Sequence, residues 1–112
     1  MLETFKALAE PNRFEIVELL LQGPRAVGEL VEQLQLNQPQ VSKHLRVLTN
    51  AGLVEAQPDA QRRIYALRPA PLQELDAWIE RYRRVWQANF ERLDSLLEEM
   101  KSKEDKYGRN KR

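Results

Sequence analysis

Apolar residues recur every three or four positions in the first half of the chain, which predicts helices. Three breaks divide this pattern: Pro11, whose ring cannot sit deep inside a helix, the stretch Gln22–Pro24, and Gly52. Asn37 is predicted to cap the last helix, because its side-chain oxygen can accept a hydrogen bond from an orphan amide. The four predicted helices lie at about residues 2–9, 14–21, 27–34 and 38–51, and the second is apolar enough to predict heavy burial.

The spacing of apolar residues changes after Gly52. Leu53–Gln57 and Arg62–Leu67 are rich in strand-forming residues and flank a polar tip, so they predict a β-hairpin. From Leu72 to Met100 apolar residues return at close to 3.5 positions, which predicts an amphipathic helix ~45 Å long. The remaining residues, 101–112, are mostly charged and are predicted to form a disordered basic tail.

Together these elements predict a mainly α fold with a small β-hairpin (α+β). Two helices joined by about three residues, followed directly by a hairpin, are typical of a winged helix-turn-helix. The long last helix would serve for dimerisation. We therefore predict one winged helix-turn-helix DNA-binding and dimerisation domain at residues 1–100 and a tail at residues 101–112.

The fourth predicted helix has a polar and basic side opposite Val41, Leu45 and Leu48. A helix fits the major groove, where glutamine can pair with adenine and lysine with guanine. In isolation such a polar side would more often be only solvated, and His44 would serve equally well at the edge of the core. The order of the elements favours the DNA interpretation. The predicted DNA-binding residues are Gln38, Gln40, Ser42, Lys43, His44, Arg46, Arg62 and Arg63.

Composition narrows the function further. The 112 residues, 42% hydrophobic and 31% charged, suit one globular domain. The absence of cysteine excludes disulfides and zinc–thiolate sites, and a single histidine excludes a multi-histidine metal site, so we expect no metal and no cofactor. A net charge of +1 conceals a basic segment, residues 37–68, with five basic and two acidic side chains. That segment indicates a local contact with a polyanion.

No apolar run is long enough to span a membrane, and no signal-peptide pattern opens the chain, so we expect a cytoplasmic protein with no membrane partner. An enzyme is disfavoured, because the chain shows no nucleophile–base pair, no phosphate-binding glycine loop and no metal cluster.

Three strings, "ALAEPNR", "QPQVSKHLRVLTNAGLV" and "RRIYAL", together resemble the ArsR family of bacterial winged helix-turn-helix repressors. The resemblance covers about Leu2–Leu67 and extends more loosely through the last helix. It implies a homodimer built largely from the first and last helices, with two recognition helices in successive major grooves. It also implies promoter occlusion, which a metal or another signal relieves in many members.

The sequence departs from the metal-sensing members of that family. "RAVGEL", Arg25–Leu30, stands where those members carry a cysteine pair. The last helix has acids such as Asp76 and Glu80 but no histidine, and acids alone compete poorly for a transition metal. The hairpin tip also lacks the glycine common in the family, which argues against deep insertion of the wing.

Aromatic residues recur every four positions in the last helix, from Trp78 to Phe90. They could wall a pocket for an apolar effector. A dimer seam is favoured, because a long amphipathic helix cannot bury its apolar stripe against so small a core. The predicted dimer-interface residues are Leu2, Phe5, Leu75, Ile79, Tyr82, Trp86 and Leu93.

The leading hypothesis is a homodimeric transcriptional repressor without metal sensing, bound to an inverted-repeat operator in double-stranded DNA. A small-molecule or protein effector is left open. The alternative hypothesis is a winged-helix protein-interaction module that does not read DNA.

Overall fold

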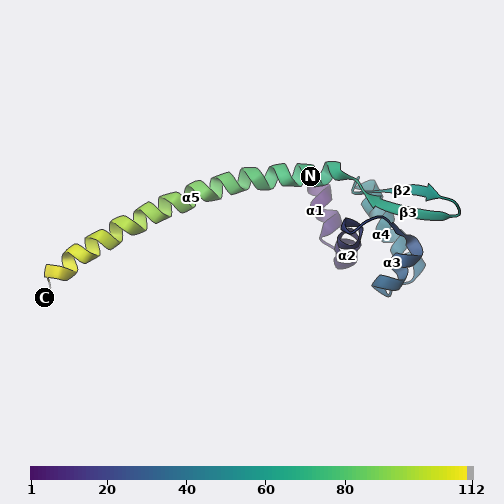
Figure 1. Cartoon of the computed structure of the whole chain (residues 1–112), viewed down its shortest axis with the longest axis horizontal. Coiled ribbons are helices and arrows are strands. Elements are labelled where there is room, and N and C mark those ends of the chain that lie inside the picture. Colours follow the sequence, from purple (N-terminus) through teal and green to yellow (C-terminus); the bar gives the residue numbers. More distant parts are fainter. Residues whose placement is uncertain (111–112) are drawn as a thin grey trace. The chain divides into compact units, whose positions relative to one another are not determined.

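The structure, a computed structural model, describes the backbone of residues 1–110 and the side chains of residues 1–104. The chain divides into one unit at Met1–Leu75 and a second that begins at Asp76. The elements, labelled in Figure 1, are α1 (Leu2–Leu8), α2 (Pro11–Leu21), β1 (Arg25–Ala26), α3 (Val27–Leu34), α4 (Gln38–Asn50), β2 (Val54–Asp59), β3 (Arg62–Leu67) and α5 (Pro69–Asn110).

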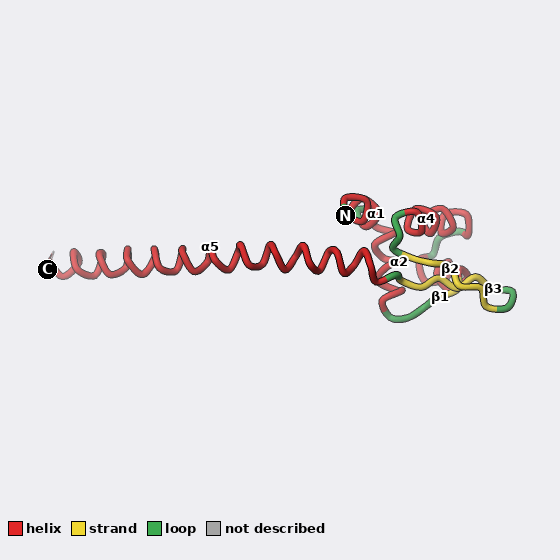
Figure 2. The backbone as a smooth tube through the Cα atoms, turned by 90° about the horizontal axis from the view of Figure 1, so that it is seen from above, coloured by secondary structure: helices red, strands yellow, loops and turns green. Residues whose placement is uncertain are grey.

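The predicted mainly α fold with a β-hairpin is confirmed. Figures 1 and 2 show the hairpin β2–β3 projecting past the helices of the first unit as a wing. The two-residue strand β1 was not predicted. It pairs antiparallel with β3 and gives a three-stranded sheet of order β1-β3-β2.

The wing differs from its prediction at the tip. Strand β2 continues to Asp59, so Pro58 lies within a strand and pairs with Arg63 instead of forming the turn. An edge strand tolerates proline, because one side of it needs no amide donor. The turn falls at positions 60–61, where Ala60 adopts a left-handed conformation with φ 53°.

The core of the first unit lies between α2, α3, α4 and the start of β2. Its largest fully buried side chains are Ile16, Leu30, Val41, Leu45, Leu48, Leu53 and Val54. The expected heavy burial of α2 holds only for its inner side. Phe14 and Leu21 are 50% and 60% exposed, because they lie on the opposite side of the helix from Ile16 and Leu20.

Local signals fix the ends of α4. Asn37 accepts a hydrogen bond from the Gln40 amide at 2.9 Å, which confirms the predicted N-cap. After the last turn, Gly52 takes φ 77°. The amide of Leu53 then bonds to the carbonyl of Leu48, and that of Gly52 to the carbonyl of Thr49, as in a Schellman motif.

The last helix extends further than predicted. Helix α5 remains helical to Asn110, whereas we expected disorder from residue 101 onward. Helix propagation needs only good helix formers once a helix exists, and the lysines and the glutamate after Met100 supply them without a buried core. Positions 111 and 112 of the predicted tail lie outside the described residues, and the boundary at residue 100 stays a prediction.

Candidate nucleic-acid interface

Helix α4 is held on the core by its inner side. Val41, Leu45 and Leu48 are buried to 1% exposure or less. Side chains three or four residues apart share one side of a helix, so the remaining positions form strips that face away from the core. One of these strips, Gln38, Ser42 and Arg46, is turned toward the wing.

Between this strip and the wing lies a groove of about 900 Å³. Pro58, Arg63 and Tyr65 contribute the wing wall. These positions come from one face of the hairpin, because Pro58 pairs with Arg63 across the ladder and Tyr65 follows two residues later. The groove therefore joins the recognition helix and the wing into one continuous surface.

The lining of this groove combines the apolar residues Val27, Ala56 and Pro58 with polar and cationic groups. It contains the guanidinium groups of Arg46 and Arg63, several amides and hydroxyls, and no carboxylate. Such a surface attracts phosphates, and its amides and hydroxyls can exchange hydrogen bonds with base edges.

The two adjacent arginines of the wing are placed differently. Only Arg63 lines the groove, whereas both arginines line a second pocket beside α3, together with Glu29 and Glu32. Arg62 lies 3.6 Å from the Asp59 carboxylate, with both side chains well exposed. This exposed pair partly neutralises Arg62 and leaves Arg63 as the cation of the groove wall.

Gln40 takes part in the N-terminal cap of α4. Its side-chain oxygen accepts a hydrogen bond from the Asn37 amide at 3.1 Å, and Asn37 returns one to the Gln40 amide. In this capping box the Gln40 oxygen is engaged, so only its NH₂ group can donate outward. Bidentate pairing with adenine needs both a donor and an acceptor, and in Gln40 the capping bond competes for the acceptor.

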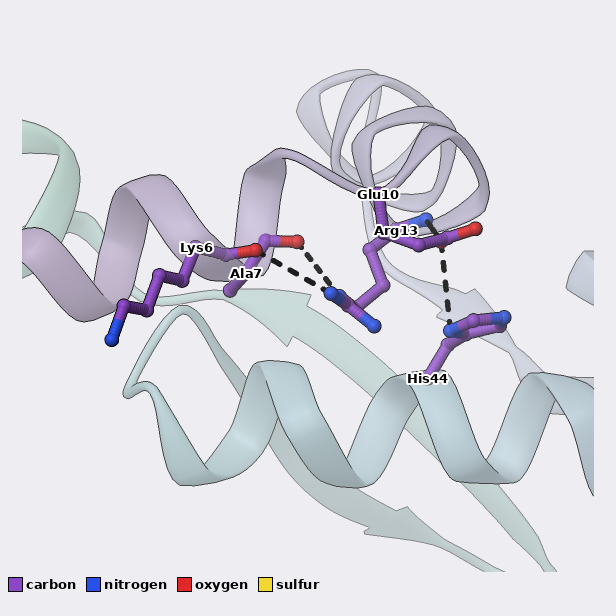
Figure 3. Close-up of polar contacts among 5 residues, drawn as sticks. All are labelled: Lys6, Ala7, Glu10, Arg13 and His44. Atoms are coloured by element: carbon purple, nitrogen blue, oxygen red, sulfur yellow. Dashed lines mark hydrogen bonds and ion pairs between the residues drawn. The ribbon is translucent and has the colours of Figure 1, made fainter.

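His44 faces the core side of α4 and not the groove. Its Nδ1 lies 3.6 Å from a carboxylate oxygen of Glu10, and its side chain is 17% exposed (Figure 3). Glu10 caps α2 by accepting a hydrogen bond from the Arg13 amide at 2.8 Å. This placement fits the interpretation of His44 as a boundary residue. Lys43 is exposed on the outer side of the helix.

The surroundings of Glu10 shift its ionisation. Partial burial raises the pKa of its carboxyl, but this effect is outweighed by hydrogen bonds from the Arg13 and Asn12 amides and by the charges of His44 and Arg13. The net result is a pKa below the ordinary value. Glu10 therefore favours its charged form between the start of α2 and the side of α4.

Arg13 joins the same junction to α1. Its Nε donates to the Ala7 carbonyl at 2.8 Å, and a terminal nitrogen donates to the Lys6 carbonyl at 3.4 Å (Figure 3). These carbonyls lie in the last turn of α1, where a cation is favourable, and the Lys6 carbonyl also accepts from the Ala9 amide at 3.3 Å. The string "EPNR" thus caps one helix and begins the next.

Several residues of the groove were not predicted. Thr49, Asn50, Gln61 and Tyr65 also line it. Helical spacing could have found the first two, because Asn50 follows Arg46 by four positions and Thr49 follows Ser42 by seven. Gln61 and Tyr65 depend on how the wing folds against α4, which no local pattern shows.

The predicted dimer-interface residues lie in both units. Leu2 and Phe5 of α1 are exposed, and Leu75 is partly buried. In the second unit Ile79, Tyr82, Trp86 and Leu93 are each 42–50% exposed. The aromatic rings form a row along α5, with centroids 5.8 Å apart between Tyr82 and Trp86 and 5.2 Å apart between Trp86 and Phe90.

Within the described part of the chain, no group of three or more histidine, cysteine, aspartate or glutamate side chains could hold a metal ion. No helix among those residues is long and apolar enough to cross a membrane.

Comparison with known proteins decides the family. The pattern that defines the bacterial regulatory protein, ArsR family, matches residues 10–56. The HTH-type transcriptional regulator Rv2034 of Mycobacterium tuberculosis is 45% identical over 78 residues, which are 70% of this chain and 73% of that protein. This chain belongs to the ArsR family. It is thus a transcriptional regulator with a winged-helix DNA-binding domain, and family members of this kind are not enzymes.

Two further relatives regulate transcription in opposite directions. The transcriptional repressor SdpR of Bacillus subtilis is 30% identical and matches 70% of this chain and 88% of its own length. The transcriptional activator HlyU of Vibrio cholerae is 39% identical and matches 75% of this chain and 76% of its own length.

Solved ArsR-family structures share the fold. The ArsR family transcriptional regulator RHA00566 superposes with a TM-score of 0.67 at 27% identity, over 76% of this chain and 88% of its own. A Mycobacterium bovis protein, Mb0332, is described as a homodimeric winged helix-turn-helix DNA-binding domain. It superposes with a TM-score of 0.61 at 32% identity, over 72% of this chain and 75% of its own.

Proposed function

We propose that this ArsR-family chain is a homodimeric, sequence-specific repressor that binds an inverted-repeat operator. The groove between α4 and the wing carries the proposal, because it offers two guanidinium groups and several amides and hydroxyls without a carboxylate. If the polar side of α4 were only solvated, there would be no reason for an arginine of the wing, Arg63, to line the same groove. Gln38, Ser42 and Arg46 would meet base edges, and Arg63 would meet the phosphate backbone.

The homodimer is supported by the exposed apolar side of α5 and by the homodimeric relative Mb0332. A two-fold dimer presents two recognition helices to half-sites about one helical turn, ~34 Å, apart. Repression follows if the operator overlaps a promoter. The relative HlyU is an activator, so we expect the position of the operator to decide whether transcription is repressed or activated.

We also propose that transition metals do not induce this protein through thiolate or imidazole sites. The chain contains no cysteine, and its one histidine, His44, lies against Glu10 on the inner flank of α4. The carboxylates that remain favour hard cations over the thiophilic metals.

The decisive experiment is selection of bound sequences from a random DNA pool, followed by anisotropy titrations over a salt series. We expect a pseudo-palindromic consensus and a steep salt slope. Lys43→Ala should weaken binding to every sequence and reduce the salt slope by about 1, without lowering the free energy of unfolding. Lys6→Ala, a change of an exposed lysine on α1, is the matched control.

A protein-interaction module would behave differently. It would select no consensus and would bind all duplexes weakly, with Lys43→Ala and Lys6→Ala equally affected. That outcome would refute the proposed function.

A further inference from the structure

A smaller cavity lies between α1 and the last turns of α4, within the first unit of the chain. Its volume is about 290 Å³, at the lower end of the range for small-molecule sites. Ala7 of α1, together with Val47 and Ala51 of α4, gives it apolar walls. Its polar groups come from Glu3, Lys6, Arg13 and Asn50. Apolar walls with a few polar groups are the usual composition of a ligand pocket.

Arg13 presents a fixed cation to this cavity. Its Nε and Nη2 donate to the carbonyls of Ala7 and Lys6, and these bonds hold the guanidinium between α1 and α4 (Figure 3). The third nitrogen, Nη1, has no hydrogen-bond partner among the residues that the structure describes. A guanidinium stays charged at every physiological pH, so Nη1 is an available donor for an anion.

Lys6 adds a second positive charge at the edge of the cavity. Its side chain is exposed, and its ammonium group forms no ion pair within the described part of the chain. Glu3 carries the one carboxylate of the lining, so the two cations outnumber it. An anionic group of a ligand suits this pair of donors, and a carboxylate is the smallest organic one. The rest of the ligand should be apolar, because the walls offer it no hydrogen bonds.

The cavity shares one residue with the DNA-binding groove. Asn50 lines both, since its position on α4 falls between the groove strip and Val47. A carboxylate held beside Asn50 would add negative charge close to the phosphates of bound DNA, and like charges at short range repel. Ligand and operator would therefore weaken each other's binding.

We propose that this cavity binds a small monocarboxylate with a short aliphatic tail, and that the bound ligand weakens operator binding. The carboxylate bridges Arg13 Nη1 and the Lys6 ammonium, and the tail lies against Val47 and Ala51. Ligand binding involves the first unit alone, whereas its effect on the operator rests on the function proposed above.

Hexanoate is the probe, and hexan-1-ol, which has the same tail without the charge, is its control. Millimolar hexanoate should give saturable shifts of the backbone amides of Ala7, Asn50 and Ala51 in spectra of the ¹⁵N-labelled full-length protein. Hexan-1-ol should bind about tenfold more weakly, as for loss of a hydrogen bond to a charged group. In anisotropy titrations at constant ionic strength, saturating hexanoate should reduce affinity for the selected operator about tenfold.

Two variants test the assignment of the site. Lys6→Gln should weaken hexanoate binding about tenfold and leave operator affinity without hexanoate unchanged. Lys101→Gln, the same change at an exposed lysine of α5, is the matched control and should bind hexanoate normally. Ala51→Leu fills the cavity and keeps both cations, so it should abolish hexanoate binding. Ala51 has a helical conformation that leucine can adopt, and urea unfolding checks that the variant is folded.

Absence of saturable shifts, or shifts confined to other parts of the chain, would overturn the proposal. Equal binding of hexan-1-ol, or equal losses in Lys6→Gln and Lys101→Gln, would do the same. Hexanoate that binds in the cavity without changing operator affinity would overturn the regulatory part. Failure of the proposed function is distinguishable from these outcomes, because it would appear without hexanoate as the absence of any selected operator.

Discussion

At the scale of single residues, Gln40 shows how one side chain is divided between folding and recognition. Its oxygen serves the capping box with Asn37, and its NH₂ group is free of that box and can donate to a ligand. We expect it to meet a phosphate oxygen, while Gln38, with both ends of its amide in the groove, is the better candidate for adenine.

Gln40→Glu tests this division. Glutamate keeps the capping acceptor and suits a helix N-terminus, so the free energy of unfolding should stay level or rise by about 0.3–1 kcal/mol. Binding to the selected operator should fall about tenfold, as for loss of a hydrogen bond to a charged group. Urea unfolding and anisotropy measure the two effects.

Neutral methylphosphonates placed singly in the operator provide the control for the added charge. The wild-type protein should bind more weakly when one particular phosphate is replaced. The same replacement should not change the affinity of Gln40→Glu. A change of base preference at one position, without a uniform loss, would contradict this assignment.

Glu10 makes a pH-dependent contribution to stability. Its pKa is lowered in the folded protein, so its charged form stabilises the fold above the ordinary carboxyl pKa, and this contribution is lost as the pH falls through the folded-state value. Glu10→Gln should therefore destabilise the protein more at pH 7 than at about pH 3. Urea unfolding at both pH values measures the difference.

Glu15→Gln, at an exposed carboxylate of α2, controls for the loss of one charge. An equal effect of Glu10→Gln at both pH values would mean that the contacts with Arg13 and His44 do not favour the charged carboxylate.

At the scale of elements, the recognition helix depends on how its two ends are fixed. The capping box sets where α4 begins, and the left-handed Gly52 sets where it ends and where β2 starts. The interactions at both ends involve only neighbouring residues, so they fix the position of α4 on the core without contacts from the wing.

Gly52→Ala should cost about 1–2 kcal/mol of unfolding free energy, because an L-residue resists the left-handed region. The added methyl group would lie 3.9 Å from Pro71, so the cost is conformational and not a clash. Gly28→Ala is the matched control. It lies in α3 with no heavy atom within 4 Å of the added methyl, and it should be neutral or stabilising by up to about 1 kcal/mol. Thermal unfolding of both variants measures this, and equal effects would contradict it.

At the scale of the whole molecule, operator recognition is expected to depend on two copies. Two linked recognition helices gain avidity, so a full inverted repeat should bind about 100-fold more tightly than one half-site. Leu93→Glu places a charge at a predicted dimer-interface residue of α5 and should remove most of this preference while leaving half-site affinity unchanged.

Ser95→Glu adds the same charge on the opposite side of α5 from Leu93 and should keep the preference. Sedimentation at matched concentrations identifies the assembly present in each titration. If Leu93→Glu retained the full-site preference as a dimer, the contact between copies would have to lie elsewhere, such as at Leu2 and Phe5 of α1.

The sequence alone determined most of the elements, because their signals are local. Helical spacing, the cap at Asn37 and the stop at Gly52 act within a few residues, and they predicted α1 to α4 and the hairpin closely. The spacing of apolar residues along α5, close to 3.5 positions, is likewise a property of the chain. The resemblance carried by the strings from α1 to β3 is confirmed by the family match.

Tertiary structure decided which side chains face the groove. Arg63 lines the groove and Arg62 does not, and the packing of α2 beside α4 turned His44 toward Glu10. Strand β1, two residues long, forms only because β3 lies beside it. These outcomes depend on contacts between residues far apart in the chain, and no periodicity within one segment encodes them.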